Sequence, residues 1–210
     1  MSDRSLLSDE RASGAAEFAL VLIPLLMMLF GIIDGGRWLW ECNQAEKATQ
    51  FGARVAVVTD VIPSGLKATF VGKTVGSVTL TQGDVIPAAA LGTVTCSKPS
   101  GTLSCSCAAC SGLTLTPLVT TGWDKIVARM QLIDPRISES NVVVEYRGSG
   151  LGYAGDPSGM DISPLVTVRV SQLTFQPITT FVFPSLSLSL PDFATTLTAE
   201  DLSGTADQKD

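Results

Sequence analysis

Hydrophobic residues are concentrated first near the N-terminus. Residues 18–33 are sixteen consecutive positions without a charged side chain. With Ala15 and Ala16, and interrupted only by Glu17, the run reaches 19 residues, close to the ~20 residues that an α-helix needs to cross a bilayer. Trp38 and Trp40 follow, where interfacial aromatic residues commonly lie. We therefore predict a transmembrane helix over 13–36, in preference to a buried core helix or a signal peptide cleaved after the apolar run.

A second pattern continues from the apolar run. Small and apolar residues recur in steps of three and four as far as Val58, and the charged residues lie off this stripe. This spacing is typical of a helix with one buried face. We predict a single helix from about residue 16 to about residue 60, of which 37–62 is a soluble continuation that packs on a domain through small side chains.

After Pro63 the amino-acid composition shifts to Gly, Thr, Ser and Val, which favours strands and turns. We predict an α+β fold: the long helix packs on a small antiparallel, β-rich head over 63–198 that contains one further helix. The expected elements are strand-like alternation at 75–81, a loop or small hairpin at 96–112, a helix at 122–134, strands at 141–147, 165–175 and 186–190, and a long loop at 148–164. The residues expected to share one face are Trp123, Ile126, Val127, Met130 and Ile133 on the helix, Val142, Val144 and Tyr146 on the first of these strands, and Val166, Val168 and Val170 on the second.

Some local features follow from this assignment. Thr121 and Asp124 resemble a capping box at the start of the second helix. The buried phase of 165–175 reverses near Gln172, which predicts a bulge there. Residues 1–12 are expected to form a short leader and 199–210 a disordered tail, because both segments are polar.

Charge and composition narrow the functions that this chain can have. The 210 residues carry a net charge of −6 and no run of basic residues, which argues against a nucleic-acid partner. Histidine is absent, which removes the commonest general base and the commonest metal ligand. The carboxylates in the loop-rich half show no spacing that pairs them for acid–base chemistry; they are Glu139, Glu145, Asp156 and Asp161. The glycine-rich segment 148–152 lacks the lysine of a phosphate-binding loop. We expect no enzyme activity, no cofactor and no metal.

Five cysteines are the other distinctive feature. Cys96, Cys105, Cys107 and Cys110 lie within 15 residues, which behind an export anchor predicts disulfides in an oxidising compartment. A four-thiolate metal site is disfavoured because one pair alone has the usual knuckle spacing. Two pairings remain open: 96–105 with 107–110, or 96–107 with 105–110. Cys42, on the long helix, either stays outside these bridges or takes one of the four as its partner.

Glu17 is unusual because a carboxylate near the start of a membrane helix is costly and calls for a partner. One available cation is an α-amine, which proteolysis a few residues upstream would create. The alternative is that Glu17 extends to the lipid headgroups.

These N-terminal residues resemble a known family. Arg11–Pro24 (RASGAAEFALVLIP) and Gly31–Arg37 (GIIDGGR) are similar to the N-terminus of TadE-like proteins, which are minor pilins or pseudopilins of the tight-adherence (Tad/Flp, type IVc) pilus system. The shared pattern is a stretch of small residues, Glu-Phe, an apolar run with an early proline, and Gly-x-x-Asp-x-Gly-Arg. The similarity continues over 45–54, and scattered similarity is found at 123–130 (WDKIVARM) and 175–178 (FQPI).

The resemblance implies a pilin-like fold and cleavage by an aspartic prepilin peptidase on the cytoplasmic side of the helix. It implies that Glu17 is the fifth residue of the mature chain, so that the cut follows Ala12 and Ser13 becomes the new N-terminus. Glycine usually precedes this cut, and a cut after Gly14 would make Glu17 the third residue instead. Glu17, with the adjacent Phe18, would then serve peptidase recognition or assembly.

The resemblance also suggests a role for Asp34 and Arg37, which lie three residues apart on one helix. They either form a local ion pair at the membrane interface or set the register in which this helix packs against other helices. The implied partners are membrane lipid, other Tad pilins and pseudopilins, and the prepilin peptidase. The implied location is the bacterial inner membrane, crossed once, with the head in the periplasm or incorporated in a pilus. The alternative function is a membrane-tethered binding or adhesion module without a role in a filament.

Overall fold

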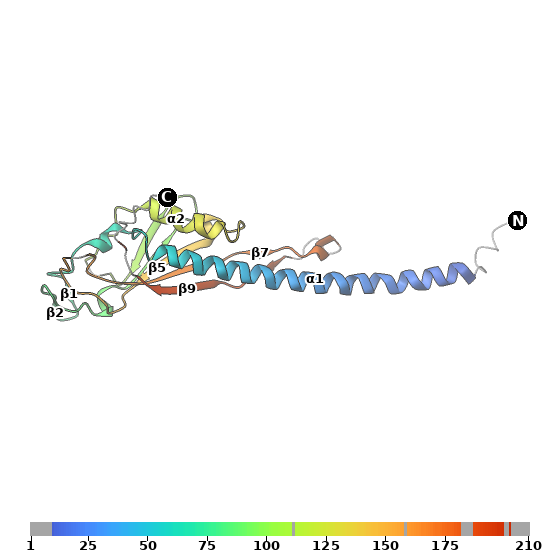
Figure 1. The fold of residues 1–210 in the computed structure, drawn as a ribbon, viewed down its shortest axis with the longest axis horizontal. Helices are drawn as coiled ribbons and strands as arrows, with labels where there is room; N and C mark the ends of the chain where they lie inside the picture. The colour runs from blue at the N-terminus through green and yellow to red at the C-terminus, as the bar shows by residue number, and fades with distance from the viewer. Residues whose placement is uncertain (1–9, 111, 158, 182–186, 200–201, 203–210) are drawn as a thin grey trace. The chain divides into compact units, whose positions relative to one another are not determined.

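The computed structural model describes residues 10–110, 112–157, 159–181, 187–199 and 202. The chain divides into two compact units, which we describe separately. The N-terminal unit comprises Met1–Glu41 and Thr174–Ser189, and the head unit comprises Cys42–Leu173 and Leu190–Asp210. Figure 1 shows the elements of both units. Residues 1–9 of the predicted leader, and all of the predicted tail except Ala199 and Leu202, lie outside the described residues.

The predicted long helix is present as α1 (Glu10–Ala56), a continuous helix of 47 residues that includes Pro24. It begins six residues before the predicted start and ends four residues before the predicted end. The prediction that the uncharged run and the stripe of small residues belong to one continuous helix is therefore confirmed.

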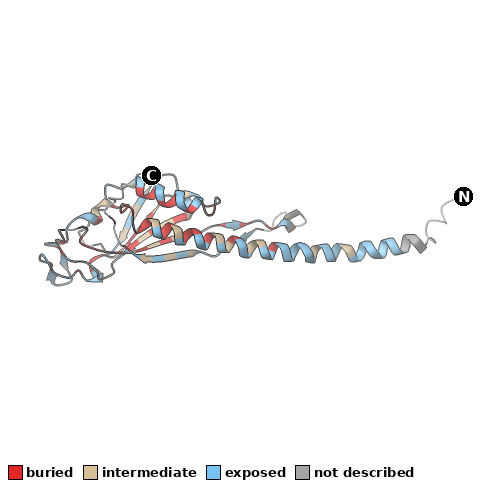
Figure 2. Cartoon of the chain, viewed as in Figure 1, coloured by how far each residue is buried: buried red, intermediate tan, exposed pale blue. Residues whose placement is uncertain are grey.

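Burial changes along α1, as Figure 2 shows. Nearly all residues from 14 to 33 are exposed, including large apolar side chains such as Leu20 (73% exposed) and Ile32 (66% exposed). In the part of α1 that belongs to the head unit, Ala45, Ala48 and Ala53 are fully buried. The predicted stripe of small residues therefore forms the packed face of the helix at Ala45, Ala48 and Gly52, whereas Val58, its predicted last member, is 45% exposed and lies beyond the end of α1.

The head unit is built on a five-stranded antiparallel sheet in the order β4-β3-β5-β6-β9. Its strands are β3 (Thr93–Ser97), β4 (Ser104–Ala108), β5 (Val142–Arg147), β6 (Leu165–Val170) and β9 (Phe193–Thr198). The predicted inward faces of β5 and β6 are confirmed, because Val142, Val144, Tyr146, Val166, Val168 and Val170 are all fully buried. Alternation of valines with polar residues thus placed one face of the sheet against the core.

Two helical segments pack against this buried face. A Cβ atom added at Gly52 of α1 would lie 2.7 Å from Met130 of α2 (Thr120–Gln131) and 3.3 Å from Val168 of β6. Glycine at this position therefore lets the three elements meet. Of the face predicted for α2, Trp123, Ile126, Val127 and Met130 are buried, whereas Ile133 lies beyond the end of the helix and is half-buried. The other face of the sheet is half-exposed and carries an ion pair between Arg169 and Glu145 (3.6 Å).

The predicted capping box of α2 is wrong. The helix begins at Thr120 with Val119 at the N-cap, which makes no side-chain hydrogen bond to the helix. Thr121 consequently lies inside the first turn, where its hydroxyl cannot act as an N-cap.

The predicted bulge near Gln172 is a complete break between strands. β6 ends at Val170, and Gln172 adopts a left-handed conformation with φ = 61°. The chain then starts a separate two-stranded sheet, in which β7 (Thr174–Phe175) pairs with β8 (Leu188–Ser189). The change in apolar phase therefore marks an exit from the main sheet. β8 is the described part of the strand predicted at 186–190, and Leu186 lies outside the described residues.

The remaining elements are short. The alternation at 75–81 forms a tight hairpin of β1 (Thr74–Val75) and β2 (Val78–Thr79), with Gly76 at φ = 63° in its turn. The 3-10 turns are η1 (Ser64–Lys67), η2 (Ala88–Ala90), η3 (Glu139–Asn141) and η4 (Ile178–Phe181). β9 was not predicted, although Phe193, Thr195 and Leu197 alternate in exposure with their neighbours.

Candidate functional site

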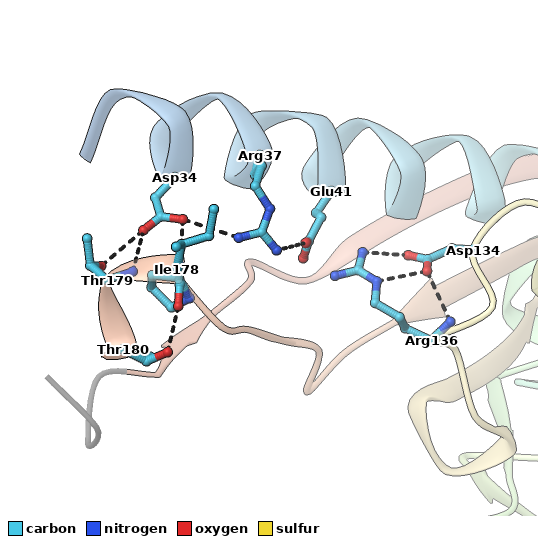
Figure 3. Close-up of polar contacts among 9 residues, drawn as sticks. Asp34, Arg37, Glu41, Asp134, Arg136, Ile178, Thr179 and Thr180 are labelled. Atoms are coloured by element: carbon cyan, nitrogen blue, oxygen red, sulfur yellow. Dashed lines mark hydrogen bonds and ion pairs between the residues drawn. The ribbon is translucent and has the colours of Figure 1, made fainter. Parts of the chain in front are cut away.

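A cluster of hydrogen bonds and ion pairs in the N-terminal unit surrounds Asp34 on α1. Asp34 is the first charged residue after the apolar run, yet it is 6% exposed. Its Oδ1 atom accepts a hydrogen bond from the backbone N–H of Ile178 (2.7 Å). Its Oδ2 atom accepts hydrogen bonds from the backbone N–H (3.0 Å) and the hydroxyl (3.0 Å) of Thr179. Figure 3 shows that these donors come from the start of η4, where backbone N–H groups have no partner within the turn.

Arg37 and Glu41 extend this cluster along the same face of α1. The Arg37 guanidinium lies 3.2 Å from Asp34 Oδ1 and 3.9 Å from Glu41 Oε1 (Figure 3). It also lies over the ring of Phe175, 5.3 Å from the centroid. The Arg37 side chain is 41% exposed, so these ion pairs contribute little free energy. Hydrogen bonds from N–H groups to a charged carboxylate are each worth roughly 1.5–3 kcal/mol, so they dominate the attachment.

We call the segment Thr174–Ser189 the arm. It consists of β7, η4 and β8, and Phe175 of β7 is paired with Leu188 of β8. Phe175 lies at Arg37, and Ile178 lies at Asp34, one turn of α1 earlier. From Phe175 to Ile178 the arm therefore runs along α1 toward the N-terminus of the helix.

The predicted pair of Asp34 and Arg37 is present, but its attachment to the arm was not predicted. Asp34 and Ile178 are 144 residues apart in the chain, and nothing in a local pattern links them. The one available signal was that residues 175–178 and the motif around Asp34 both resemble the TadE-like family. A role of this pair in packing between helices of different chains remains a prediction.

The residues predicted for processing lie at the start of α1. Gly14, Glu17 and Phe18 are exposed, Phe18 by 67%. Ala12 and Ser13 also lie within the helix, which begins at Glu10. Both predicted cut positions are therefore helical, and a peptidase would need the first turns to open, as helix ends readily do.

The cysteine-rich segment forms the hairpin of β3 and β4. Cys96 lies directly opposite Cys105 in the register, and the two sulfur atoms are at disulfide distance. The sulfur atoms of Cys107 and Cys110 form the second such pair. This is the first of the two pairings left open by the sequence. Neither of these two pairs, the ones seen among the described residues, includes Cys42.

A second buried carboxylate organises the loops of the head unit. Asp161 is 5% exposed and accepts hydrogen bonds from the backbone N–H groups of Phe70 (2.6 Å), Gly155 (2.8 Å) and Asp156 (3.1 Å). The hydroxyl of Thr69 is a fourth donor (3.0 Å). Burial alone would raise the pKa of Asp161, but these hydrogen bonds outweigh it and hold the pKa below its usual value. The segment 148–164, predicted as a long loop, is thus fixed to the segment around Phe70.

Comparison with known proteins adds one finding to this geometry. Residues 12–54 match the family described as TadE-like protein. The match confirms the resemblance over nearly all of α1, including Glu17, Asp34 and Arg37, and it leaves the arm and the strands outside. No curated protein and no solved structure matches the chain. The segment 14–56 of α1 is also long and apolar enough to cross a membrane, and its most apolar part is not buried.

Proposed function

We propose, from the TadE-like segment at residues 12–54, that this protein is a non-enzymatic minor pilin or pseudopilin of a Tad/Flp-type pilus system. In this proposal α1 anchors the chain once in the bacterial inner membrane, with the head in the periplasm. The same helix then packs with other Tad pilins and pseudopilins during assembly. The observation that carries the proposal is the coincidence of the family match with an apolar helix segment that the described residues of the chain leave exposed.

Exposure of large apolar side chains supports the membrane part of the proposal. Leu20, Val21 and Ile23 are each more than 60% exposed, in a helix segment without a charged residue. Soluble proteins rarely leave so large a continuous apolar surface in water. Lipid, or the helices of other pilins, would cover it.

The cysteine pairs support the placement of the head. Pairs at disulfide distance within a short hairpin fit an oxidising compartment such as the periplasm. The positive-inside rule adds little, because the leader holds Arg4 and Arg11 together with three acidic residues.

Three of the four carboxylates considered for catalysis have structural partners, which supports an assembly role over an enzymatic one. Glu139 pairs with Lys98 (2.8 Å) and Glu145 with Arg169 (3.6 Å). Asp161 is saturated by backbone donors. Each of these three groups is therefore engaged by a partner within the head unit.

The proposal is tested by the intact mass and N-terminal sequence of the membrane-extracted protein, with and without its prepilin peptidase. We expect a peptidase-dependent start at Ser13 or Ala15, with the apolar helix retained. A chain that keeps Met1, or that is cut beyond Ile33, would contradict a pilin-type protein and favour a tethered or secreted binding module.

The variant Glu17→Ala separates the roles of this residue. We expect reduced cleavage if Glu17 serves peptidase recognition, and normal cleavage with reduced assembly if it pairs with the new α-amine. Glu46→Ala, which removes a carboxylate from the head part of α1, is the matched control. A Glu17→Ala protein that is cleaved and assembled normally would remove both roles.

A further inference from the structure

We propose that the arm is a second membrane-contacting element, with the outer face of η4 around Ile178 embedded at the edge of the bilayer that α1 crosses. The proposed occupant of this surface is lipid. The inference rests on the anchoring of α1 proposed above, and it concerns residues outside the TadE-like match.

The depth of the arm follows from α1. The sixteen uncharged residues 18–33 span about 24 Å as a helix, which is less than the ~30 Å hydrocarbon core. The core must therefore include residues beyond this run, and the predicted span 13–36 contains Asp34. The N–H of Ile178 lies 2.7 Å from the Asp34 carboxylate, which fixes η4 at the same depth.

The direction of the arm leads into the bilayer. Its contact with α1 moves from Arg37 at Phe175 to Asp34 at Ile178, and so toward the apolar run. The sequence from 170 to 191 contains no charged residue. An insertion of this composition encounters no Lys, Arg, Asp or Glu that would resist transfer to lipid.

The N–H and hydroxyl groups of residues 178–180 are satisfied from inside the N-terminal unit, as contact with lipid requires. The N–H groups of Ile178 and Thr179 and the Thr179 hydroxyl all donate to Asp34. The hydroxyl of Thr180 donates to the carbonyl of Pro177 (2.7 Å), and its N–H donates to the same oxygen (3.2 Å). The Ile178 side chain, by contrast, is 44% exposed. The turn thus directs its hydrogen bonds inward and an apolar side chain outward.

This arrangement also accounts for a charged residue at the membrane edge. A carboxylate in the hydrocarbon region is costly unless it is paired. The arm supplies three donors, and Arg37 supplies a countercharge at 3.2 Å. Asp34 and the arm therefore make each other compatible with the bilayer.

The test uses the full-length protein in vesicles of phosphatidylethanolamine and phosphatidylglycerol. A diazirine amino acid is placed at position 178 and, in separate proteins, at positions 32 and 132, and adducts are identified by mass spectrometry. Ile32 (66% exposed, on α1) reports the membrane span, and Leu132 (74% exposed, in the head unit) reports the aqueous side. We expect position 178 to give a lipid yield comparable to position 32 and at least about tenfold above position 132, because hydrocarbon contains almost no water to consume the carbene.

The other outcomes overturn the inference in distinguishable ways. Lipid adducts at position 32 without adducts at 178 would leave the anchor intact and remove the arm from the bilayer. Adducts of position 178 with a second copy of the chain would make the arm a protein interface. A lack of lipid adducts at both 178 and 32 would contradict the proposed anchoring itself.

Discussion

The two parts of α1 show opposite relations between side-chain size and burial. From residue 14 to residue 33 the large side chains, such as Leu20 and Ile32, are exposed, whereas from 45 to 56 the buried positions are mostly alanine, glycine and threonine. Small residues allow the second part to approach α2 and β6 closely, as at Gly52. Large apolar residues on the first part are not covered by any part of the chain that the structure describes. One helix therefore serves two environments, which differ in what they require of side-chain volume.

The largest expected effects come from placing a charged residue in each part of α1, because the two parts should respond differently. Ala53 is fully buried in the head unit, so Ala53→Asp should destabilise the head by about 4 kcal/mol or more, through an unpaired buried charge. Leu25→Asp, in the exposed part, should leave head stability unchanged and weaken insertion by about 2.5–3.5 kcal/mol. Denaturant unfolding followed by circular dichroism measures the first effect, and carbonate extraction of membranes measures the second. Equal loss of head stability in both variants would show that the two parts are not independent.

Removal of the Asp34 carboxylate should release the arm where the two environments meet. Asp34→Ala leaves the N–H groups of Ile178 and Thr179 without their acceptor, at roughly 1–3 kcal/mol for each buried donor. We expect hydrogen exchange at these two amides to accelerate on the order of 10–100-fold. Arg37→Ala is the control and should have a smaller effect, because the guanidinium is partly exposed. Unchanged exchange in Asp34→Ala would mean that other contacts hold the arm.

Acidic pH should lower the stability of the head unit through protonation of its buried carboxylate, Asp161. Because the pKa of Asp161 in the folded protein lies below its ordinary value of 3.8, folding favours the ionised form. This contribution is present in full above the ordinary value and is lost as the pH falls through the lower folded value. The denaturation midpoint of the wild type should therefore decline in this acidic range, and that of Asp161→Asn should decline less. The matched control is Asp124→Asn, at an exposed position of α2, and an acid slope that Asp161→Asn leaves unchanged would contradict the assignment.

The smallest expected effect concerns the junction after α1. The fully buried Tyr146 hydroxyl accepts a hydrogen bond from the backbone N–H of Ile62 (3.3 Å). Tyr146→Phe keeps the packing and removes this acceptor, so urea unfolding should show a loss of about 1 kcal/mol. The effect should be confined to the head unit, with membrane extraction as for the wild type. A stability equal to the wild type would show that water or another group replaces the hydroxyl.

Periodic patterns predicted the elements whose burial repeats locally. The small residues of α1 from Ala45 to Gly52, four of the five residues predicted for the inward face of α2, and the alternating valines of β5 and β6 are buried as expected. In each of these elements the buried face recurs with the period of the helix or the strand. The same spacing of apolar residues therefore appears directly in the sequence.

Features that depend on distant partners were missed. The attachment of Asp34 to the arm joins residues 144 positions apart, and the donors are backbone groups that any sequence could supply. The Asp161 cluster likewise uses mainly backbone N–H groups, which leave no trace in composition. β9 was not predicted because it is an edge strand in which no residue is fully buried, so its two faces differ little in their sequence. Of the two open cysteine pairings, the register of β3 and β4 decides for Cys96 with Cys105, and a register is a property of the folded sheet.

The distance in the chain between Asp34 and Ile178 also has a consequence for biosynthesis. Ribosomes add roughly 5–20 residues per second, so the 144 residues between them take about 7–30 s to synthesise. During this interval the Asp34 carboxylate is made but its arm is not, and water or lipid headgroups must solvate it. Its position directly after the apolar run, and not within it, gives a nascent chain access to that solvation. The order of translation thus restricts where along a helix such an attachment point can lie.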